Sequence, residues 1–89
     1  MKSKQSTIVN KLGLHARAAA RLVSLAAGFS ANIEIEYKGR KVNGKSIMGV
    51  MMLAAGKGAV ITLYADGHDA NEALQRMDQL IADRFEEAE

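Results

Sequence analysis

Apolar residues recur along the chain at two spacings, one typical of strands and the other typical of helices. Asn32–Tyr37 alternates strictly between apolar residues and Asn or Glu, which predicts a strand with one face in water. Residues 7–11 and 59–65 are rich in β-branched side chains and predict two more strands, the second of them in the middle of the sheet. The Lys-Gly turn that follows Tyr37 predicts a hairpin that leads into a short strand over residues 40–42.

Three segments have the periodicity of helices. Ala16–Ala27 is rich in alanine and leucine, and its larger apolar residues share one face. Ser46 is a good N-cap for the apolar run over residues 47–55, which contains too much glycine and methionine to favour a strand, so we expect a short helix there. An Asp-x-x-Glu capping box at residues 69–72 opens the clearest helix of the chain, whose apolar stripe ends at Phe85.

The order of these elements, β-α-β-β-α-β-α, cannot be built from hairpins alone. We therefore predict an α+β fold in which the helices stack on one face of a sheet while the other face is open to water. At 89 residues the chain is long enough for one hydrophobic core and too short for two. Residues 1–89 should form a single domain.

Composition and charge exclude several classes of protein. With 48% hydrophobic and 25% charged residues the chain should fold, and the lack of cysteine excludes disulfides and thiolate metal sites. Two histidines far apart, without a matched pair of carboxylates, do not indicate a metal site. No stretch approaches the roughly 18 apolar residues of a membrane helix, so we expect a cytoplasmic protein, and we predict a monomer without a cofactor. The net charge of +2 favours a partner with an acidic face over nucleic acid.

The most informative stretch is Gly-Leu-His-Ala-Arg at residues 13–17, where a glycine turn opens into a helix. The first turn of a helix has backbone N–H groups without partners and a partial positive charge, so it would hold a phosphoryl group on His15. The same dipole disfavours imidazolium, so we expect a neutral, nucleophilic ring. Arg17 can bring its guanidinium to the phosphoryl oxygens.

These features predict a carrier of phosphoryl groups and not an enzyme. Phosphoryl transfer needs little beyond a nucleophile, positive charge and an accessible surface, because charge in its loose transition state is spread over three oxygens. The chain has no GxxxxGK[ST] loop to hold nucleotide phosphates. The phosphoryl donor should therefore be another protein.

Two motifs resemble the HPr phosphocarriers of the bacterial phosphotransferase system: LGLHARAAARLV over residues 12–23 and KSIMGVMMLAA over residues 45–55. The resemblance covers nearly the whole chain and implies an open-faced β-sandwich of four antiparallel strands and three helices. It implies that His15 receives phosphate on Nδ1 from phospho-Enzyme I and passes it to a histidine of an EIIA-type protein. Enzyme I is itself phosphorylated by phosphoenolpyruvate. Arg17 matches the arginine of the family motif. Ser46 matches the serine that a dedicated HPr kinase phosphorylates in many members, which makes it a candidate regulatory site.

The chain departs from the family motif at Ala18, where proline is usual. Proline is tolerated in a first helical turn and stiffens it, whereas alanine is a strong helix former. We expect the carrier chemistry to survive with a less rigid site.

A docking surface is predicted beside His15, because methionine suits surfaces that accept several partners and the second predicted helix carries three methionines. We expect at least one of the three to pack in the core and the others to join an exposed apolar patch with a basic rim. The partner-binding residues predicted for this patch and its rim are Ile47, Met48, Met51, Arg17, Arg21 and Lys45.

Two alternatives remain open. A nitrogen-branch paralogue, NPr, would use the same chemistry for regulation, and the surroundings of Ser46 favour the sugar-type HPr over it. A small RNA-binding α+β domain is the alternative from another class. Such sheets stack bases on aromatic side chains, yet only Tyr37 and Tyr64 lie on predicted strands, Tyr37 falls on the apolar face, and the RNP pattern is missing.

Overall fold

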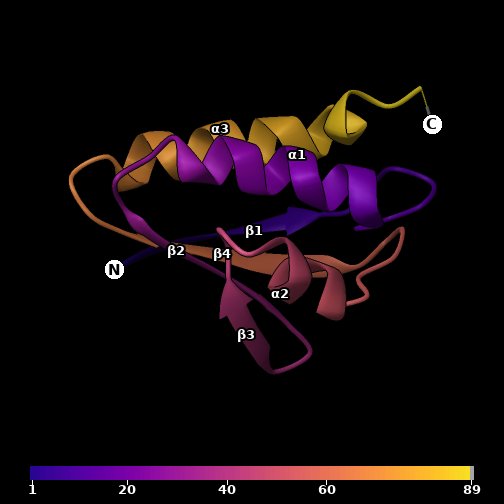
Figure 1. Ribbon diagram of the computed structural model, residues 1–89, viewed down its shortest axis with the longest axis horizontal. Coiled ribbons are helices and arrows are strands. Elements are labelled where there is room, and N and C mark those ends of the chain that lie inside the picture. The colour runs from indigo at the N-terminus through magenta and orange to yellow at the C-terminus, as the bar shows by residue number, and fades with distance from the viewer. Residues whose placement is uncertain (89) are drawn as a thin grey trace.

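The structure, a computed structural model that describes residues 1–88, is an open antiparallel sheet with helices on one face (Figure 1). The order and the antiparallel pairing of its elements confirm the predicted α+β class and the open-faced sandwich. The elements are β1 (Lys2–Thr7), α1 (Ala16–Ala27), β2 (Asn32–Tyr37), β3 (Arg40–Asn43), α2 (Ile47–Met52), β4 (Val60–Asp66), α3 (Ala70–Ala82) and the 3-10 turn η1 (Arg84–Glu86).

Strand β4 lies inside the sheet, as its apolar sequence predicts, and the strand order is β1-β4-β2-β3. It pairs with every residue of β1 on one side and with β2 on the other. Its inward side chains, Ile61, Leu63 and Ala65, are completely buried. The sheet therefore offers one apolar face for the helices to cover.

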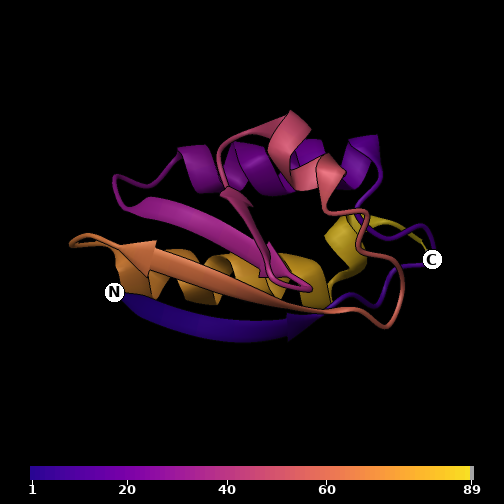
Figure 2. The same ribbon diagram turned by 90° about the horizontal axis from the view of Figure 1, so that it is seen from below.

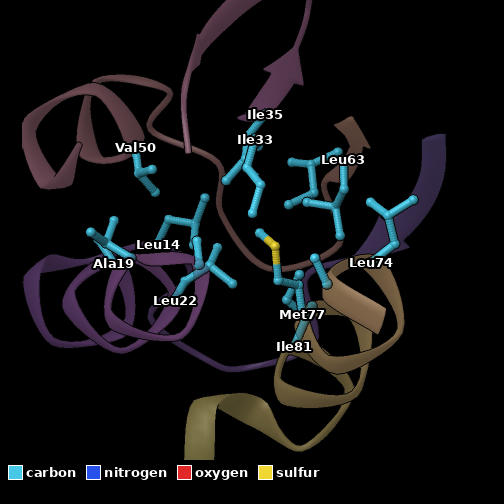
Figure 3. Close-up of a cluster of buried hydrophobic side chains, with 14 of the residues drawn as sticks. Leu14, Ala19, Leu22, Ile33, Ile35, Val50, Leu63, Leu74, Met77 and Ile81 are labelled. Atoms are coloured by element: carbon cyan, nitrogen blue, oxygen red, sulfur yellow. The ribbon is translucent and has the colours of Figure 1, made fainter. Parts of the chain in front are cut away.

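Helices α1 and α3 lie side by side over this face, and α2 packs against α1 next to β3 (Figures 1 and 2). Sheet and helices enclose one hydrophobic core, in which Leu22 of α1, Ile35 of β2 and Met77 of α3 are completely buried (Figure 3). Removal of this apolar surface from water is the main force that holds the layers together. Among the described residues, no helix has both the length and the apolarity needed to cross a membrane.

The first strand lies earlier in the sequence than the pattern predicts. Strand β1 comprises Lys2–Thr7 and not residues 7–11, and only Ser6 within it is buried. As an edge strand with polar side chains on both faces, β1 has no apolar alternation to reveal it, and its place is set by pairing with β4. The residues beyond it, including the fully buried Ile8 and Asn10, form the loop that leads to α1.

Helices α2 and α3 end earlier than predicted. Helix α2 stops at Met52 and not at residue 55, and Ala54 takes a left-handed backbone with φ of 53° that turns the chain away. Helix α3 stops at Ala82, and Phe85 lies beyond it in η1, where its side chain is fully buried. Phe85 thus continues the apolar stripe of α3 without being part of the helix.

The predicted capping box at the start of α3 does not form. Asp69 occupies the N-cap position, but its side chain makes no cap hydrogen bond. Its carboxylate instead accepts the backbone N–H groups of Ser30 at 2.8 Å and Ala31 at 2.9 Å. The bond from Ser30 is the main cause of a lowered Asp69 pKa; the bond from Ala31 adds to it and desolvation opposes it. Asp69 therefore ties α3 to the loop after α1.

Candidate functional site

His15 begins α1, and a tight contact between two loops fixes its position. It is the N-cap, with extended backbone (φ −72°, ψ 178°), and its carbonyl accepts the N–H of Ala19 at 2.8 Å. The preceding Leu14 donates its N–H to the carbonyl of Ala55 at 2.9 Å. Gly13 has φ of 67°, and a Cβ there would lie 2.5 Å from that same carbonyl oxygen. Because only glycine permits this approach, the loop after α2 determines where His15 stands.

The two ring nitrogens of His15 have different partners. Nδ1 accepts the backbone N–H of Arg17 at 3.3 Å, and Nε2 lies 2.5 Å from Oε2 of Glu87. A ring nitrogen that accepts a hydrogen bond carries no proton, so this geometry places a lone pair on Nδ1 and the proton on Nε2. The lone pair thus stands at the N-terminus of α1. The side chain is 26% exposed, which leaves the ring accessible from one side.

Glu87 connects His15 to a buried asparagine. Its Oε1 accepts a hydrogen bond from Nδ2 of Asn10 at 2.9 Å, and the same Nδ2 donates to the carbonyl of Gly13 at 2.9 Å. Desolvation of the Glu87 carboxyl raises its pKa. The hydrogen bonds from Asn10 and His15, together with the positive charge of Arg17, outweigh that effect, so the Glu87 pKa is lowered. Glu87 therefore stands beside His15 as a carboxylate.

A pocket of about 700 Å³ opens beside His15. Arg17 and Arg21 lie on its wall, and no acidic side chain belongs to the first turn of α1 in the described part of the chain. The helix dipole, the N–H groups of the first turn and the arginines make this end of α1 attractive to an anion. The other lining residues are Lys11, Leu12, Ala16, Glu86, Glu87 and Ala88.

Arg21 also ties α1 to the turn that follows α3. Its Nη1 donates a hydrogen bond to the backbone carbonyl of Phe85, the buried aromatic residue of η1. This bond helps to bring the last described residues back to the start of α1, where they lie beside the loop that leads to His15 (Figures 1 and 2). The predicted docking residue Arg21 is therefore part of the scaffold of the site.

Lys45 lies at the other end of α1. Its Nζ donates to the carbonyl of Phe29 at 2.7 Å, just past the C-terminus of α1, whereas His15 stands at the N-terminus. A helix of 12 residues is about 18 Å long. Arg17 and Arg21 thus flank His15, and Lys45 does not join them in one rim.

The outer surface of α2 is apolar, as predicted, and we call its four large exposed side chains the α2 patch. The exposed fractions are 44% for Ile47, 70% for Met48, 37% for Met51 and 61% for Met52. The expectation that at least one of the methionines packs in the core is wrong. Val50, and Leu53 just after the helix, pack in the core instead. A helix this short presents only one narrow face to the core.

Ser46 caps α2 as predicted. Its Oγ accepts the backbone N–H of Gly49 at 3.1 Å. Helix α2 runs antiparallel to α1, since Lys45 reaches the C-terminal end of α1 while Ala55 contacts the loop before His15 (Figure 2). Ser46 therefore lies at the end of α2 that is farther from His15.

Sequence reasoning missed Asn10 and Glu87. Asn10 falls in a range predicted as a strand, and Glu87 lies past the last predicted helix, in a group of acidic residues. The only available signal was the concentration of acids at the end of a mildly basic chain. In the described residues no group of three potential metal ligands comes together.

Comparisons with known proteins show the family and the fold to which the chain is similar. A family model described as the PTS HPr component phosphorylation site matches residues 2–83. The chain is 53% identical to the phosphocarrier protein HPr of Cupriavidus necator over 89 residues, the whole of both chains. A crystal structure of HPr from Thermoanaerobacter tengcongensis has a TM-score of 0.95 at 45% identity, again over the whole of both chains. A crystal structure of an HPr dimer from that bacterium has a TM-score of 0.78 at 46% identity, over 98% of this chain and 100% of the other. The chain therefore belongs to the HPr family of phosphocarrier proteins of the phosphotransferase system.

Proposed function

We propose that His15 accepts a phosphoryl group on Nδ1 and hands it on, and that the protein catalyses no reaction of its own on a small molecule. One observation carries the proposal: the Nδ1 lone pair lies at the N-terminus of α1, next to a pocket walled by Arg17 and Arg21. Three phosphoryl oxygens placed there meet backbone N–H groups and guanidinium groups, which favour negative charge.

In the proposed transfer the lone pair of Nδ1 attacks the phosphorus of a phosphohistidine on Enzyme I. The new N–P bond forms as the donor's N–P bond breaks, and the electron pair of the broken bond returns to the donor ring. Arg17 offsets the negative charge of the transferring group. The same steps in reverse pass the group to a histidine of an EIIA-type protein. Membership of the HPr family supports these partners, and both would meet the carrier in the cytoplasm.

The α2 patch is the proposed docking surface for both partners. It is exposed and apolar, and Arg17 and Arg21 flank His15 at the end of α1 nearest to the C-terminus of α2. Such a surface suits a partner with an apolar centre and an acidic edge. We propose that the protein works as a monomer, which keeps this surface open. Sedimentation at micromolar concentration would reveal a dimer like that of the HPr from Thermoanaerobacter tengcongensis.

Ser46 is a proposed regulatory site for an HPr kinase. Its hydroxyl is partly exposed and already caps α2 through Gly49. A phosphate there would suit the helix terminus and add about two negative charges next to the docking surface. Its effect would fall on partner binding and not on folding.

The decisive experiment mixes the protein with Enzyme I and phosphoenolpyruvate and looks for an acid-labile phosphate. We expect the phosphate in the wild type, none in His15→Ala, and a normal yield in His68→Ala, which removes the other, exposed histidine. Arg17→Ala should slow the transfer on the order of tenfold, while Arg76→Ala on α3 should leave it unchanged. Phosphate that survives in His15→Ala would refute the proposal.

The open face of the sheet favours the carrier over the RNA-binding alternative. Tyr64 donates its hydroxyl to Glu36 at 2.6 Å, and the ammonium of Lys41 sits 4.3 Å from the centre of the Tyr64 ring. The ring face that would stack a base is therefore occupied, and the neighbouring acids repel phosphates. Transfer to EIIA proteins of the sugar branch, measured against those of the nitrogen branch, would separate HPr from the NPr alternative.

A further inference from the structure

The carboxylate of Glu87 contacts one of the two ring nitrogens of His15 and not the other. We propose that Glu87, held by Asn10, is a positioning residue that keeps the His15 proton on Nε2 and so presents Nδ1 as the nucleophile. The inference rests on the proposed function, because it explains why one ring nitrogen and not the other would take the phosphoryl group.

Two separate contacts assign the same protonation state to the ring. The backbone N–H of Arg17 points at Nδ1 from 3.3 Å, which requires a lone pair there. The carboxylate of Glu87 lies 2.5 Å from Nε2 on the opposite side of the ring, which requires a proton there. A hydrogen bond to an ionised acceptor is stronger than one to a neutral acceptor, so Glu87 sets the tautomer of His15. The contact from the Arg17 N–H requires the same tautomer.

Asn10 in turn orients Glu87. Its Nδ2 donates to Oε1 of Glu87 and to the carbonyl of Gly13, both at 2.9 Å, so rotation of the amide would set its oxygen against two acceptors. Asn10 is fully buried, and its Oδ1 finds no hydrogen-bond partner among the described residues. A buried acceptor without a hydrogen bond costs stability. The two hydrogen bonds that the Asn10 amide donates therefore indicate a positioning role and not a stabilising one.

The turn that delivers Glu87 is held in an unusual backbone conformation. Arg84, Phe85 and Glu86 have φ of 59°, 54° and 65°, a region that residues other than glycine rarely adopt. The buried ring of Phe85 and the hydrogen bond from Arg21 to its carbonyl hold the turn against this preference. Strain of this kind persists where surrounding contacts impose it, and here it places a carboxylate behind His15.

This arrangement serves both directions of transfer without moving a proton. When Nδ1 attacks, its lone pair becomes the new N–P bond and the proton stays on Nε2, so the ring acquires a positive charge. The carboxylate of Glu87 offsets that charge. When the N–P bond breaks in the next transfer, its electron pair returns to Nδ1 and the ring is again neutral, with its proton still shared with Glu87. A carboxylate behind a histidine orients the ring and stabilises its cation in the same way in hydrolases.

The test compares Glu87→Ala with Asp83→Ala, which removes the same charge from an exposed position four residues earlier. Protein whose histidines are labelled with ¹⁵N in the ring is examined by ¹⁵N–¹H correlation NMR at neutral pH. The chemical shifts of Nδ1 and Nε2 report which nitrogen carries the proton. Phosphoryl transfer from phospho-Enzyme I is timed on the same samples. We expect one tautomer, protonated on Nε2, in the wild type and in Asp83→Ala, and a mixture in Glu87→Ala with transfer slowed on the order of tenfold.

Three results would overturn the inference: a mixture already in the wild type, a Glu87→Ala spectrum like that of Asp83→Ala, or a changed tautomer with an unchanged transfer rate. Failure of the wild type to take up phosphate would refute the carrier proposal instead. The NMR comparison would still decide whether Glu87 controls the ring.

Discussion

Gly13 and Ala55 are in direct backbone contact: a Cβ on Gly13 would lie 2.5 Å from the carbonyl oxygen of Ala55 and 2.7 Å from Cα of the next glycine, Gly56. Backbone atoms cannot yield as the tip of a side chain does. The contact joins the loop before His15 to the loop after α2, so the histidine and the proposed docking helix share one support.

Gly13→Ala should therefore destabilise the protein by more than about 2 kcal/mol, since it combines an unfavourable φ with a backbone clash. Gly39→Ala is the matched control, because Gly39 also has positive φ, 80°, but nothing lies within 4 Å of its added Cβ. That variant should lose only about 1 kcal/mol, the cost of the left-handed conformation. Urea denaturation at neutral pH measures both, and equal losses would show that the contact with Ala55 is not tight.

The bonds from Ser30 and Ala31 to Asp69 make stability depend on pH. Because the folded-state pKa of Asp69 is lowered below its ordinary value of 3.8, its contribution is present above that value and is lost as pH falls through the folded-state pKa. Asp69→Asn should lower the urea midpoint at pH 7, and its difference from the wild type should shrink below about pH 4. Asp66→Asn, at the exposed end of β4, is the control. A difference from the wild type that is constant from pH 7 to pH 3 would contradict this account.

Much of the fold follows from local patterns. Helix α1, strand β2 and the central place of β4 were predictable because each has a strong apolar period and belongs to the core. Strand β1 was not, because an edge strand with polar faces is defined by its partner and not by its own sequence. The Asp69 cap failed for a related reason: its carboxylate found donors 38 and 39 residues away, beyond the reach of any local rule.

The site divides in the same way. The placement of His15 and Arg17 at the start of α1 was predictable, because the glycine turn and the helix start that position them are formed by neighbouring residues alone. The contacts of Asn10 with Glu87 and of Glu87 with His15 were not predictable, because they form only after the chain has returned past α3. The position of Lys45 depends likewise on the antiparallel packing of α2 on α1. A local sequence pattern predicts where the proposed nucleophile stands, and the tertiary structure brings to it the residues that we propose orient it.

Met48→Asp should weaken docking without unfolding the protein. Met48 is 70% exposed in the α2 patch, so the substitution breaks no core contact but places a charge in the apolar centre of the proposed interface. The KM for the carrier in the Enzyme I reaction should rise on the order of tenfold, with kcat little changed. Val60→Asp makes the same change on β4, where Val60 is 51% exposed, and should leave KM unaltered. Equal effects of the two variants would exclude the α2 patch as the docking surface.

Substitutions at Ser46 separate its cap from its proposed regulation. Ser46→Ala removes the acceptor of the Gly49 N–H and should cost about 1 kcal/mol of stability. Asp and Asn both cap helices well, so Ser46→Asp and Ser46→Asn should fold with nearly wild-type stability.

Only Ser46→Asp adds a negative charge, and only this variant should slow transfer from Enzyme I, roughly tenfold at low salt, because it repels an acidic partner. The effect should fade as salt rises to about 1 M, where the screening length is close to 3 Å. Stopped-flow or quench measurements of transfer over a salt series decide the matter. If Ser46→Asn slows transfer as much as Ser46→Asp does, the charge of a phosphate cannot be the signal, and Ser46 acts through the geometry of α2 alone.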